Sequence, residues 1–488
     1  MKQTQDINGR PFNKIALVIT LLAGTFCTVL NGTILSTAFP TLMKTFSISV
    51  STVQWLTTGF MLVNGVMIPV SAWLSTRIDS RWLYIFAMTI FLGGTVICYL
   101  APSFAVLLAG RLIQGVAVGI TMPLMQTIML SVFEPEKRGI AMGLSGLVIG
   151  LAPAIGPTLS GWVIDNWNWR YLFSIIIPIV ALVVIASFFT MRPVLKTSHQ
   201  SIDIPSIIES TIGFGSLLYG FSAVGDDGWA SPIVLGTIAL GIVFIALFSW
   251  RQFKLEVPFL ELRVFKSPEY SLSVVLSSVT NMAMMAIGMI LPLYLQIVKG
   301  LSAFHSGLVL LLGALVTGFM SPITGAAFDR YGAKRLATTG MFFLTMGTLP
   351  FVFITQHTPT IYIVMLHAVR MFGVSMVMMP ITTSGMNALP FNLISHGTAV
   401  NNTARQVFTS MGTAILISVL TNVTNTLKPA ASLLKKAPVD YQQQFLNATV
   451  SGYRVSFALA VGFCVVTFIL ALFLKDKETI VDADLEVK

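Results

Sequence analysis

Long apolar stretches without charged residues recur along almost the whole of this 488-residue chain. A helix of about 20 apolar residues crosses the hydrocarbon core of a membrane. Cutting the sequence at charged residues and at clusters of glycine and proline gives fourteen stretches, at about 14 to 36, 53 to 76, 82 to 101, 104 to 132, 139 to 163, 171 to 191, 207 to 225, 232 to 250, 271 to 298, 304 to 328, 336 to 354, 360 to 387, 398 to 424 and 451 to 474. The sequence therefore predicts an all-α membrane protein with fourteen transmembrane helices.

The composition agrees with this prediction and excludes several classes of function. Hydrophobic residues make up 55% of the chain and charged residues only 10%, against roughly 25% charged residues in soluble domains. The net charge of +10 is scattered in short runs, so we expect no nucleic-acid partner. Cys27, Cys98 and Cys464 all lie in apolar stretches, which is typical of buried thiols. Since no phosphate-binding loop, metal-ligand cluster or nucleophile elbow occurs, we expect no cofactor, no metal and no enzyme activity.

The distribution of Lys and Arg tests the number of helices, because these residues accumulate in cytoplasmic loops. With fourteen helices and both termini in the cytoplasm, nineteen of the 29 Lys and Arg residues fall on the cytoplasmic side. Six fall on the outer side, namely Lys44, Arg170, Lys299, Lys428, Lys435 and Lys436. The remaining four lie within apolar stretches, namely Arg111, Arg370, Arg405 and Arg454. We therefore predict a multi-pass protein of the cell membrane, embedded in membrane lipid, with both termini cytoplasmic.

An internal repeat divides the chain into related halves. Three pairs of residues recur at nearly one interval: Arg77 and Arg330 lie 253 positions apart, Pro40 and Pro292 lie 252 apart, and Arg111 and Arg370 lie 259 apart. We predict an N-terminal six-helix bundle over residues 1–192, a two-helix insertion with its flanking segments over 193–265, and a C-terminal six-helix bundle with a cytoplasmic tail over 266–488. Two related bundles around a midplane site are typical of secondary transporters.

Motifs in both halves resemble the major facilitator superfamily over nearly the whole chain. Its loop motif GxxxDRxGxK is matched by Gly325, Asp329, Arg330, Gly332 and Lys334. The copy in the first half is degraded, although Arg77 and Arg81 remain. The fourth-helix motif RxxQG is matched by Arg111, Gln114 and Gly115, and the fifth-helix motif associated with antiporters by Gly150, Pro153, Gly156, Pro157 and Gly161. The resemblance implies the major facilitator fold with two inserted helices.

Other segments are similar to the fourteen-helix drug:proton antiporter family, and to its lincomycin-resistance branch, namely Leu30 to Pro40, Trp167 to Arg170 and Asn401 to Gln406. The resemblance implies alternating-access export of lipophilic or cationic small molecules, driven by a proton gradient, and we expect a monomer. An exporter or flippase of an endogenous lipid, peptide or metabolite is the alternative. A channel or a membrane-embedded enzyme would need an open pore or catalytic groups clustered at one depth, and the sequence indicates neither.

The proton carrier is not the one that the resemblance implies. The family often has an acidic residue where this chain has Asn31, and no Asp or Glu lies deep in any stretch. An imidazole titrates near neutral pH, so His367, three residues before Arg370, is the candidate, with a satisfied histidine near the membrane interface as the alternative. The nearest acidic residues are Glu209, Asp226 and Asp227.

Buried arginines are the other candidates for substrate binding or coupling. A guanidinium keeps its charge and is costly in hydrocarbon unless it faces protein, water or an acceptor. We therefore expect Arg111, Arg370 and Arg405 to face a central cavity, although Arg111 could instead bond only backbone carbonyls. The polar residues that could join them are Asn31, Thr33, Gln54, Gln114, Asn281, Asn401, Asn402 and Gln406. Interhelical hydrogen bonding explains any one of these equally well.

Two sets of residues are candidates for conformational change. Glycines repeat through the fifth stretch and include Gly150, Gly156 and Gly161, while Pro153 and Pro157 each remove a backbone donor. Small residues let helices approach closely, so we interpret this stretch as a hinge and seal; tight packing without motion is the alternative. We interpret Asp329, Arg330 and Lys334, with Gly332 and the first-half Arg77 and Arg81, as a charge latch, against the alternative of a solvated loop.

Overall fold

Long helices make up the computed structural model, which describes residues 5–35, 38–48, 50–197 and 203–474. Fourteen helical segments among these residues are long and apolar enough to cross a membrane, which confirms the predicted number. They are α1 (Lys14–Thr33), α3 (Val50–Arg77), α4 (Ser80–Leu100), α5 (Phe104–Val132), α6 (Arg138–Asn166), α7 with α8 (Tyr171–Ser174 and Ile176–Thr190), α9 (Ile204–Asp227), α10 (Pro232–Lys254), α11 (Pro268–Ile297), α12 (Ala303–Tyr331), α13 (Ala333–Thr348), α14 (Thr360–Asn387), α15 (Ile394–Leu427) and α17 (Pro438–Ala471).

Some helical structure lies outside the apolar stretches. The short helices α2 (Phe39–Phe46) and α16 (Ala431–Lys436) were not predicted, and α17 begins at Pro438 rather than near residue 451. The added turns of α17 contain Asp440 and three glutamines. Hydropathy detects the part of a helix that lipid surrounds, so it does not detect a polar continuation of the same helix.

Local polar groups set several helix ends. The side chains of Asn13, Ser103 and Ser302 accept hydrogen bonds from the first free backbone N–H groups of α1, α5 and α12, which is the usual role of an N-cap. At the other end of α12, Gly332 has a φ of 82°, a backbone conformation that glycine adopts without strain. The glycine of the loop motif therefore ends one helix and allows α13 to begin at the next residue.

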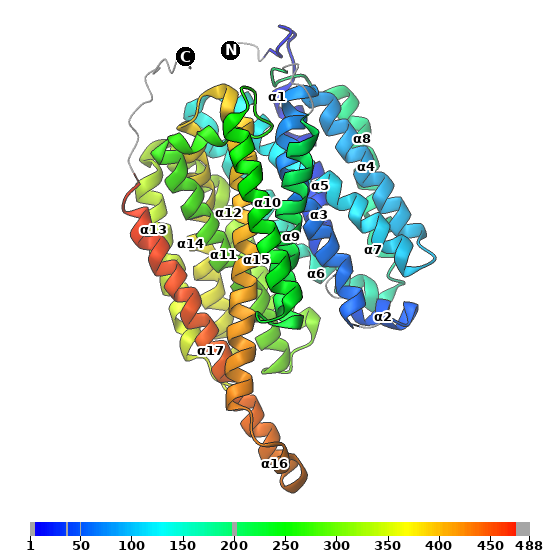
Figure 1. Cartoon of the computed structure of the whole chain (residues 1–488), viewed down its shortest axis with the longest axis vertical. Coiled ribbons are helices and arrows are strands. Elements are labelled where there is room, and N and C mark those ends of the chain that lie inside the picture. The colour runs from blue at the N-terminus through cyan, green and yellow to red at the C-terminus, as the bar shows by residue number, and fades with distance from the viewer. Residues whose placement is uncertain (1–4, 36–37, 49, 198–202, 475–488) are drawn as a thin grey trace.

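The two ends of the described chain lie at the same end of the molecule (Figure 1). We call this end the proximal face; α1 begins there at Lys14 and α12 ends there at Tyr331. The opposite end, which carries α2 and α16, is the distal face. The even number of crossings brings the chain back to the face where it started.

The membrane-length helices pack in two sets with a pair between them. Helices α1 and α3–α8 contact one another and are called the N-terminal set, and α11–α15 with α17 are called the C-terminal set. Helices α9 and α10 pack against each other, and α9 contacts α3 of one set and α15 of the other. The exact boundaries at residues 192 and 265 stay a prediction.

Helix α6 packs against α12 through glycine, and this is the tightest junction between the sets. A Cβ added to Gly325 of α12 would overlap the carbonyl oxygen of Gly139 in α6, and the reverse also holds. Further along, a Cβ at Gly143 would lie 2.5 Å from the carbonyl oxygen of Ser321, and one at Gly150 2.9 Å from Cγ2 of Thr317. Backbone thus touches backbone across the junction, as expected for small residues at membrane helix interfaces.

We predict that Gly325→Ala destabilises the protein. The new methyl group meets a backbone oxygen that cannot move away without shifting α6, and overpacking of this kind costs about 1–3 kcal/mol. The melting temperature of the purified protein, followed by fluorescence-detected gel filtration, should fall.

The matched control is Gly462→Ala in α17, where an added Cβ has no atom within 4 Å in the described structure. This variant should melt at or above the wild-type temperature, because alanine favours a helix more than glycine does. Equal melting of both variants with wild type would contradict the close approach of α6 and α12.

Candidate functional site

Arg111 lies inside the N-terminal set and is fully buried. Its Nε donates to the carbonyl oxygen of Leu56 in α3 at 3.1 Å, and its Nη1 donates to the carbonyl oxygen of Asn31 in α1 at 3.1 Å and to Oε1 of Gln114 at 2.9 Å. The guanidinium also lies 4.2 Å from the ring centre of Phe60. These are the backbone contacts of the structural alternative, so Arg111 ties three helices together, and a substrate contact for it stays a prediction.

Gln114 and Asn31 extend this network in different ways. Gln114 is buried and donates from Nε2 to Oγ1 of Thr95 in α4 at 2.9 Å. Asn31 is also fully buried, but its Oδ1 and Nδ2 have no hydrogen-bond partner among the described residues. A buried amide without partners costs free energy, and a role of Asn31 in substrate binding or coupling stays a prediction. Thr33, two residues on, packs against Gly156 of α6.

Arg370 repeats the arrangement of Arg111 in the C-terminal set. Its Nη2 donates to the carbonyl oxygens of Met284 at 2.8 Å and Ala283 at 3.5 Å, both in α11. Ala283 and Asn31 lie 252 positions apart, the interval of the sequence repeat. In each set, therefore, an arginine of the fourth helix holds the first helix by a backbone carbonyl at the equivalent position.

His367 does not bond to Arg370 in any contact that the described structure shows. Its ring packs against Gly313 of α12 and leaves Nδ1 buried without a partner. The two side chains lie on the same side of α14, but the histidine faces α12 and the arginine reaches α11.

Arg405 anchors a buried polar cluster between α11 and α15. Its Nη2 donates to Oδ1 of Asn281 at 3.3 Å, and Nδ2 of Asn281 donates to Oγ1 of Thr409 at 2.5 Å. One turn earlier in α15, Asn401 accepts from Oγ of Ser277 at 2.7 Å. Three N–H-bearing atoms here, Nε and Nη1 of Arg405 and Nδ2 of Asn401, have no acceptor within the described part of the chain.

The neighbouring face of α15 turns to the N-terminal set. Nδ2 of Asn402 donates to Oε1 of Gln126 in α5 at 2.7 Å, and this bond is buried. Gln406 lies one turn further, with its Cγ 3.2 Å from the position of a Cβ added to Gly65 in α3. Arg405 follows Ile394 by eleven residues, which places it roughly 17 Å along the helix from its proximal end. We call Asn281, Asn401, Arg405 and Gln406 the α15 cluster.

Asp329 of the loop motif bonds to α6 at the proximal face, and its role as a latch stays a prediction. The carboxylate of Asp329 accepts from the backbone N–H groups of Gly139 at 2.9 Å and Ile140 at 3.1 Å. A carboxylate of α12 thus caps the N-terminus of α6, where the helix dipole favours negative charge. Beside it, Nη1 of Arg138 donates to Oδ1 of Asn387 in α14 at 2.8 Å.

The other residues predicted for these roles lie elsewhere. Arg330 lies over the ring of Tyr331, while Arg81 donates to the carbonyl oxygen of Phe188 within its own set at 2.7 Å. Arg77 lies over the ring of its neighbour Trp73, and Lys334 is half-buried. Gln54 is exposed near the start of α3, and Gly161 has Phe304 only at ordinary contact distance. Pro153 is half-buried within α6, and the side chains of Pro157 and Asp226 lie outside the described residues.

Sequence reasoning missed three residues that join the two sets, namely Gln126, Arg138 and Asn387. Arg138 is one of the nineteen Lys and Arg residues that the sequence places on the cytoplasmic side, and its position there predicts no partner in the other set. Gln126 carried a usable signal, because it is a glutamine deep in an apolar stretch and such residues are costly in lipid unless they are paired.

Comparisons with known proteins agree with this architecture. The model of the Major Facilitator Superfamily matches residues 21–413. An uncharacterized MFS-type transporter of Bacillus subtilis, YcnB, is 46% identical over 470 residues, which cover 96% of this chain and 97% of that protein. The lincomycin resistance protein LmrB of Bacillus subtilis is 39% identical, covering 95% and 96%. The human organic anion transporter MFSD10 has a similar structure, with a TM-score of 0.64 at 14% identity over 94% of this chain and 99% of that one. The predicted major facilitator fold is confirmed.

We predict that Asp329→Asn weakens the closure of the proximal face. The substitution removes the charge that stabilises the N-terminus of α6, an effect of about 0.5–2 kcal/mol. Distances between spin labels on Trp82→Cys of α4 and Arg335→Cys of α13, both exposed at the proximal face, should shift toward longer values. The native cysteines described are buried, so background labelling should be low.

Glu134→Gln is the control for this experiment. Its carboxylate lies near the same helix end but pairs with Lys137 at 3.5 Å and is 73% exposed. It should leave the distance distribution unchanged, and a response of the same size to both variants would exclude a specific role for Asp329.

Proposed function

This chain belongs to the Major Facilitator Superfamily, and we propose that it is a secondary active exporter of lipophilic small molecules, working by alternating access with protons as the counter-ion. It is a transporter with a multi-pass helical fold and not an enzyme. A relative that is named for resistance to lincomycin and covered over almost its whole length supports drug efflux as the direction and class of transport.

One observation carries the proposal: unpaired donors of the α15 cluster lie roughly 17 Å along α15 from its proximal end, beside a bond that joins the two sets. Asn402, which bonds to Gln126 across the sets, is adjacent to Asn401 and three residues from Arg405. The other bonds between sets that the structure describes, from Arg138 and to Asp329, lie at the proximal face. A site at this depth that is sealed from one face is what alternating access requires.

The chemistry of the α15 cluster refines the substrate class. Arg405 and Asn401 offer N–H donors, and no carboxylate bonds to them among the described residues. A cation would be repelled by the guanidinium, whereas an oxygen-rich lipophilic compound can accept these hydrogen bonds. We therefore propose neutral or anionic lipophilic compounds, rather than cationic ones, as the preferred substrates.

The same observation keeps the second candidate function open. An exporter or flippase of an endogenous lipid would also need donors for a polar head group and an apolar surface for the chain. Met378 and Met379 of α14, and Met282 of α11, are buried methionines, whose flexible side chains would let the interior adapt to either substrate.

Proton coupling is the finer part of the proposal. His367 is buried with a free ring nitrogen and is the coupling group that we propose, while Asn31 provides a hydrogen-bonding amide in place of the usual carboxylate. We further propose that the proximal face meets the cytoplasm, because most Lys and Arg residues fall on that side. The structure then corresponds to a state closed toward the cytoplasm, in the cell membrane.

We predict that Arg405→Gln lowers export at least about tenfold, because a charged buried donor is lost. The assay is accumulation of a neutral lipophilic fluorescent dye in everted membrane vesicles, with and without an imposed pH gradient. Wild type should accumulate dye only with the gradient. The control is Arg454→Gln, whose exposed side chain donates to the carbonyl oxygen of Val352 far from the cluster, and which should transport normally.

Dye accumulation that is equal in wild type and in empty vesicles would count against drug export. Movement of a fluorescent lipid between leaflets, again lost in Arg405→Gln, would then support the flippase. Wild-type export that ignores the pH gradient would reject proton coupling while leaving export itself in place.

A further inference from the structure

A short segment at the proximal face connects the two helix sets on the side opposite the α6–α12 junction. Residues 255–261, which we call the strap, follow α10 and precede a 3₁₀ turn (Leu262–Lys266). The ring of Phe259 stacks on Trp73 of α3 with centres 6.2 Å apart. Two residues later, the backbone N–H of Glu261 donates to Nδ1 of His396, at the start of α15, at 3.2 Å. The strap therefore holds α3 and α15 together.

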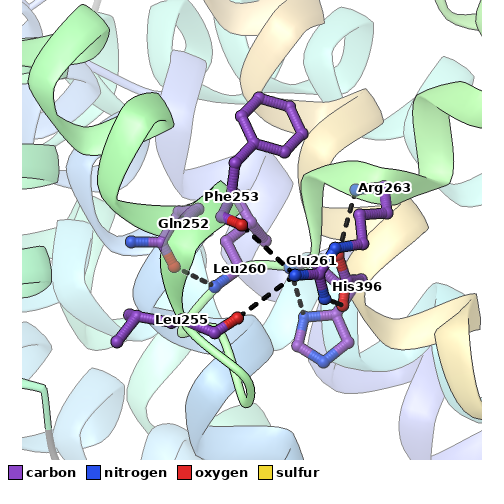
Figure 2. Close-up of polar contacts among 7 residues, drawn as sticks. All are labelled: Gln252, Phe253, Leu255, Leu260, Glu261, Arg263 and His396. Atoms are coloured by element: carbon purple, nitrogen blue, oxygen red, sulfur yellow. Dashed lines mark hydrogen bonds and ion pairs between the residues drawn. The ribbon is translucent and has the colours of Figure 1, made fainter.

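Two neighbouring backbone N–H groups of the strap, those of Leu260 and Glu261, bind side chains of different chemistry (Figure 2). The backbone N–H of Leu260 donates to Oε1 of Gln252 at 3.1 Å, and an amide has no titratable proton in the physiological range. The adjacent N–H of Glu261 donates to a histidine ring nitrogen. Two neighbouring backbone groups are thus held by one side chain that cannot titrate and one that can.

The anchor on Gln252 is itself insensitive to pH near neutrality. Nε2 of Gln252 donates to Ser206 at 2.6 Å, and Ser206 contacts Asp203, which receives two hydrogen bonds from Arg251 at 2.7 and 2.8 Å. The hydrogen bonds from Arg251 lower the pKa of Asp203 below its usual value. The carboxylate therefore stays charged throughout the range in which an imidazole titrates.

The tautomer of His396 follows from its bond. A backbone N–H can only donate, so Nδ1 must be the unprotonated nitrogen and Nε2 carries the proton of the neutral ring. A second proton on Nδ1 would turn the acceptor into a donor that faces the N–H of Glu261. The bond exists only while the ring is neutral.

Water can reach the site. His396 and Glu261 line a cavity of about 580 Å³ at the proximal face, although His396 itself is only 5% exposed. The charged residues that line this cavity are Glu256 and Glu261 of the strap and Lys196, which lies between α8 and α9. Arg263 forms an ion pair with Glu261 at 3.3 Å. Helices α3 and α5 contribute only uncharged side chains to its wall, Ser75, Thr76 and Ser131.

We propose that His396 is a proton-binding site of the proximal face, whose protonation releases the strap from α15 and so loosens the closed contact between the two helix sets. The ligand is a proton taken from the compartment that the proximal face meets. This inference goes beyond export, since it concerns the seal and needs no substrate. Its test measures the hydrogen bond directly and is independent of transport.

The experiment is amide hydrogen exchange of the full-length protein in lipid nanodiscs at about pH 4 and about pH 8. The lower value lies well below an ordinary imidazole pKa, because burial of the ring and the hydrogen bond that it accepts from Glu261 both favour neutral His396. Electron-transfer fragmentation resolves single residues, and rates are corrected for the intrinsic pH dependence of exchange. Protection of the Glu261 amide should fall about tenfold at the lower pH, the effect of losing one hydrogen bond. Protection of the Leu260 amide, held by Gln252, should change much less.

Two variants separate His396 from other causes. His396→Gln replaces the ring with a side chain that does not titrate, and it should remove the difference between the two pH values for Glu261. His357→Gln, at an exposed position near the distal face, should retain the difference. Wild-type protection of Glu261 that is equal at both pH values, or a pH effect that survives in His396→Gln, would overturn the proposal.

Discussion

The exclusion of water from the membrane interior is the constraint on which this structure depends. Every buried N–H group there must find an acceptor inside the protein, and the guanidinium groups have the most donors to satisfy. Arg111 and Arg370 meet part of this requirement by bonding to carbonyl oxygens of α1 and α11, while Nη2 of Arg111 and Nε of Arg370 have no acceptor among the described residues. Each arginine thereby fixes the fourth helix of its set against the first, and the two bonds occupy equivalent places in the repeat. Burial of these two arginines in a membrane is costly, and the same two side chains hold the first and fourth helices of each set together.

The sequence predicted much of the fold, because the membrane makes hydropathy a direct signal of helix position. The number of crossings, the common face of the chain ends and the close packing of α6 follow from residue types along the chain, whereas the identity of α12 as its partner does not. The partners of the buried polar residues did not follow, since pairing depends on rotation of each helix about its axis. His367 and Arg370 illustrate this, because their spacing predicts a shared side and yet one packs on α12 and the other bonds to α11. Arg81 likewise bonds within its own set and not across the sets.

The α15 cluster has more unpaired donors than either arginine anchor. Arg111 leaves only Nη2 and Arg370 only Nε without an acceptor among the buried atoms of the described residues. Arg405 leaves both Nε and Nη1, and Asn401 beside it leaves Nδ2. A buried charge that is under-bonded in this way costs stability. Such a cost is tolerated where binding of another molecule can recover it, as at a transport site. The same reasoning separates Asn31, whose amide is unpaired, from Gln114, whose amide is fully engaged with Arg111 and Thr95.

The closed proximal face depends on two different junctions, and the chain secures each by a different device. On one side, α6 and α12 meet backbone to backbone, and Asp329 of α12 caps the N-terminus of α6. On the other side, α3 and α15 correspond in the repeat to α12 and α6, but α9 contacts both of them and the strap joins Trp73 to His396. Under the proposed alternating access, opening of the proximal face separates both pairs of helices, so both devices have to release. Because the Asp329 carboxylate and the His396 imidazole lie at different junctions, the proton uptake proposed for His396 acts on the second junction and leaves the bonds of Asp329 to α6 in place.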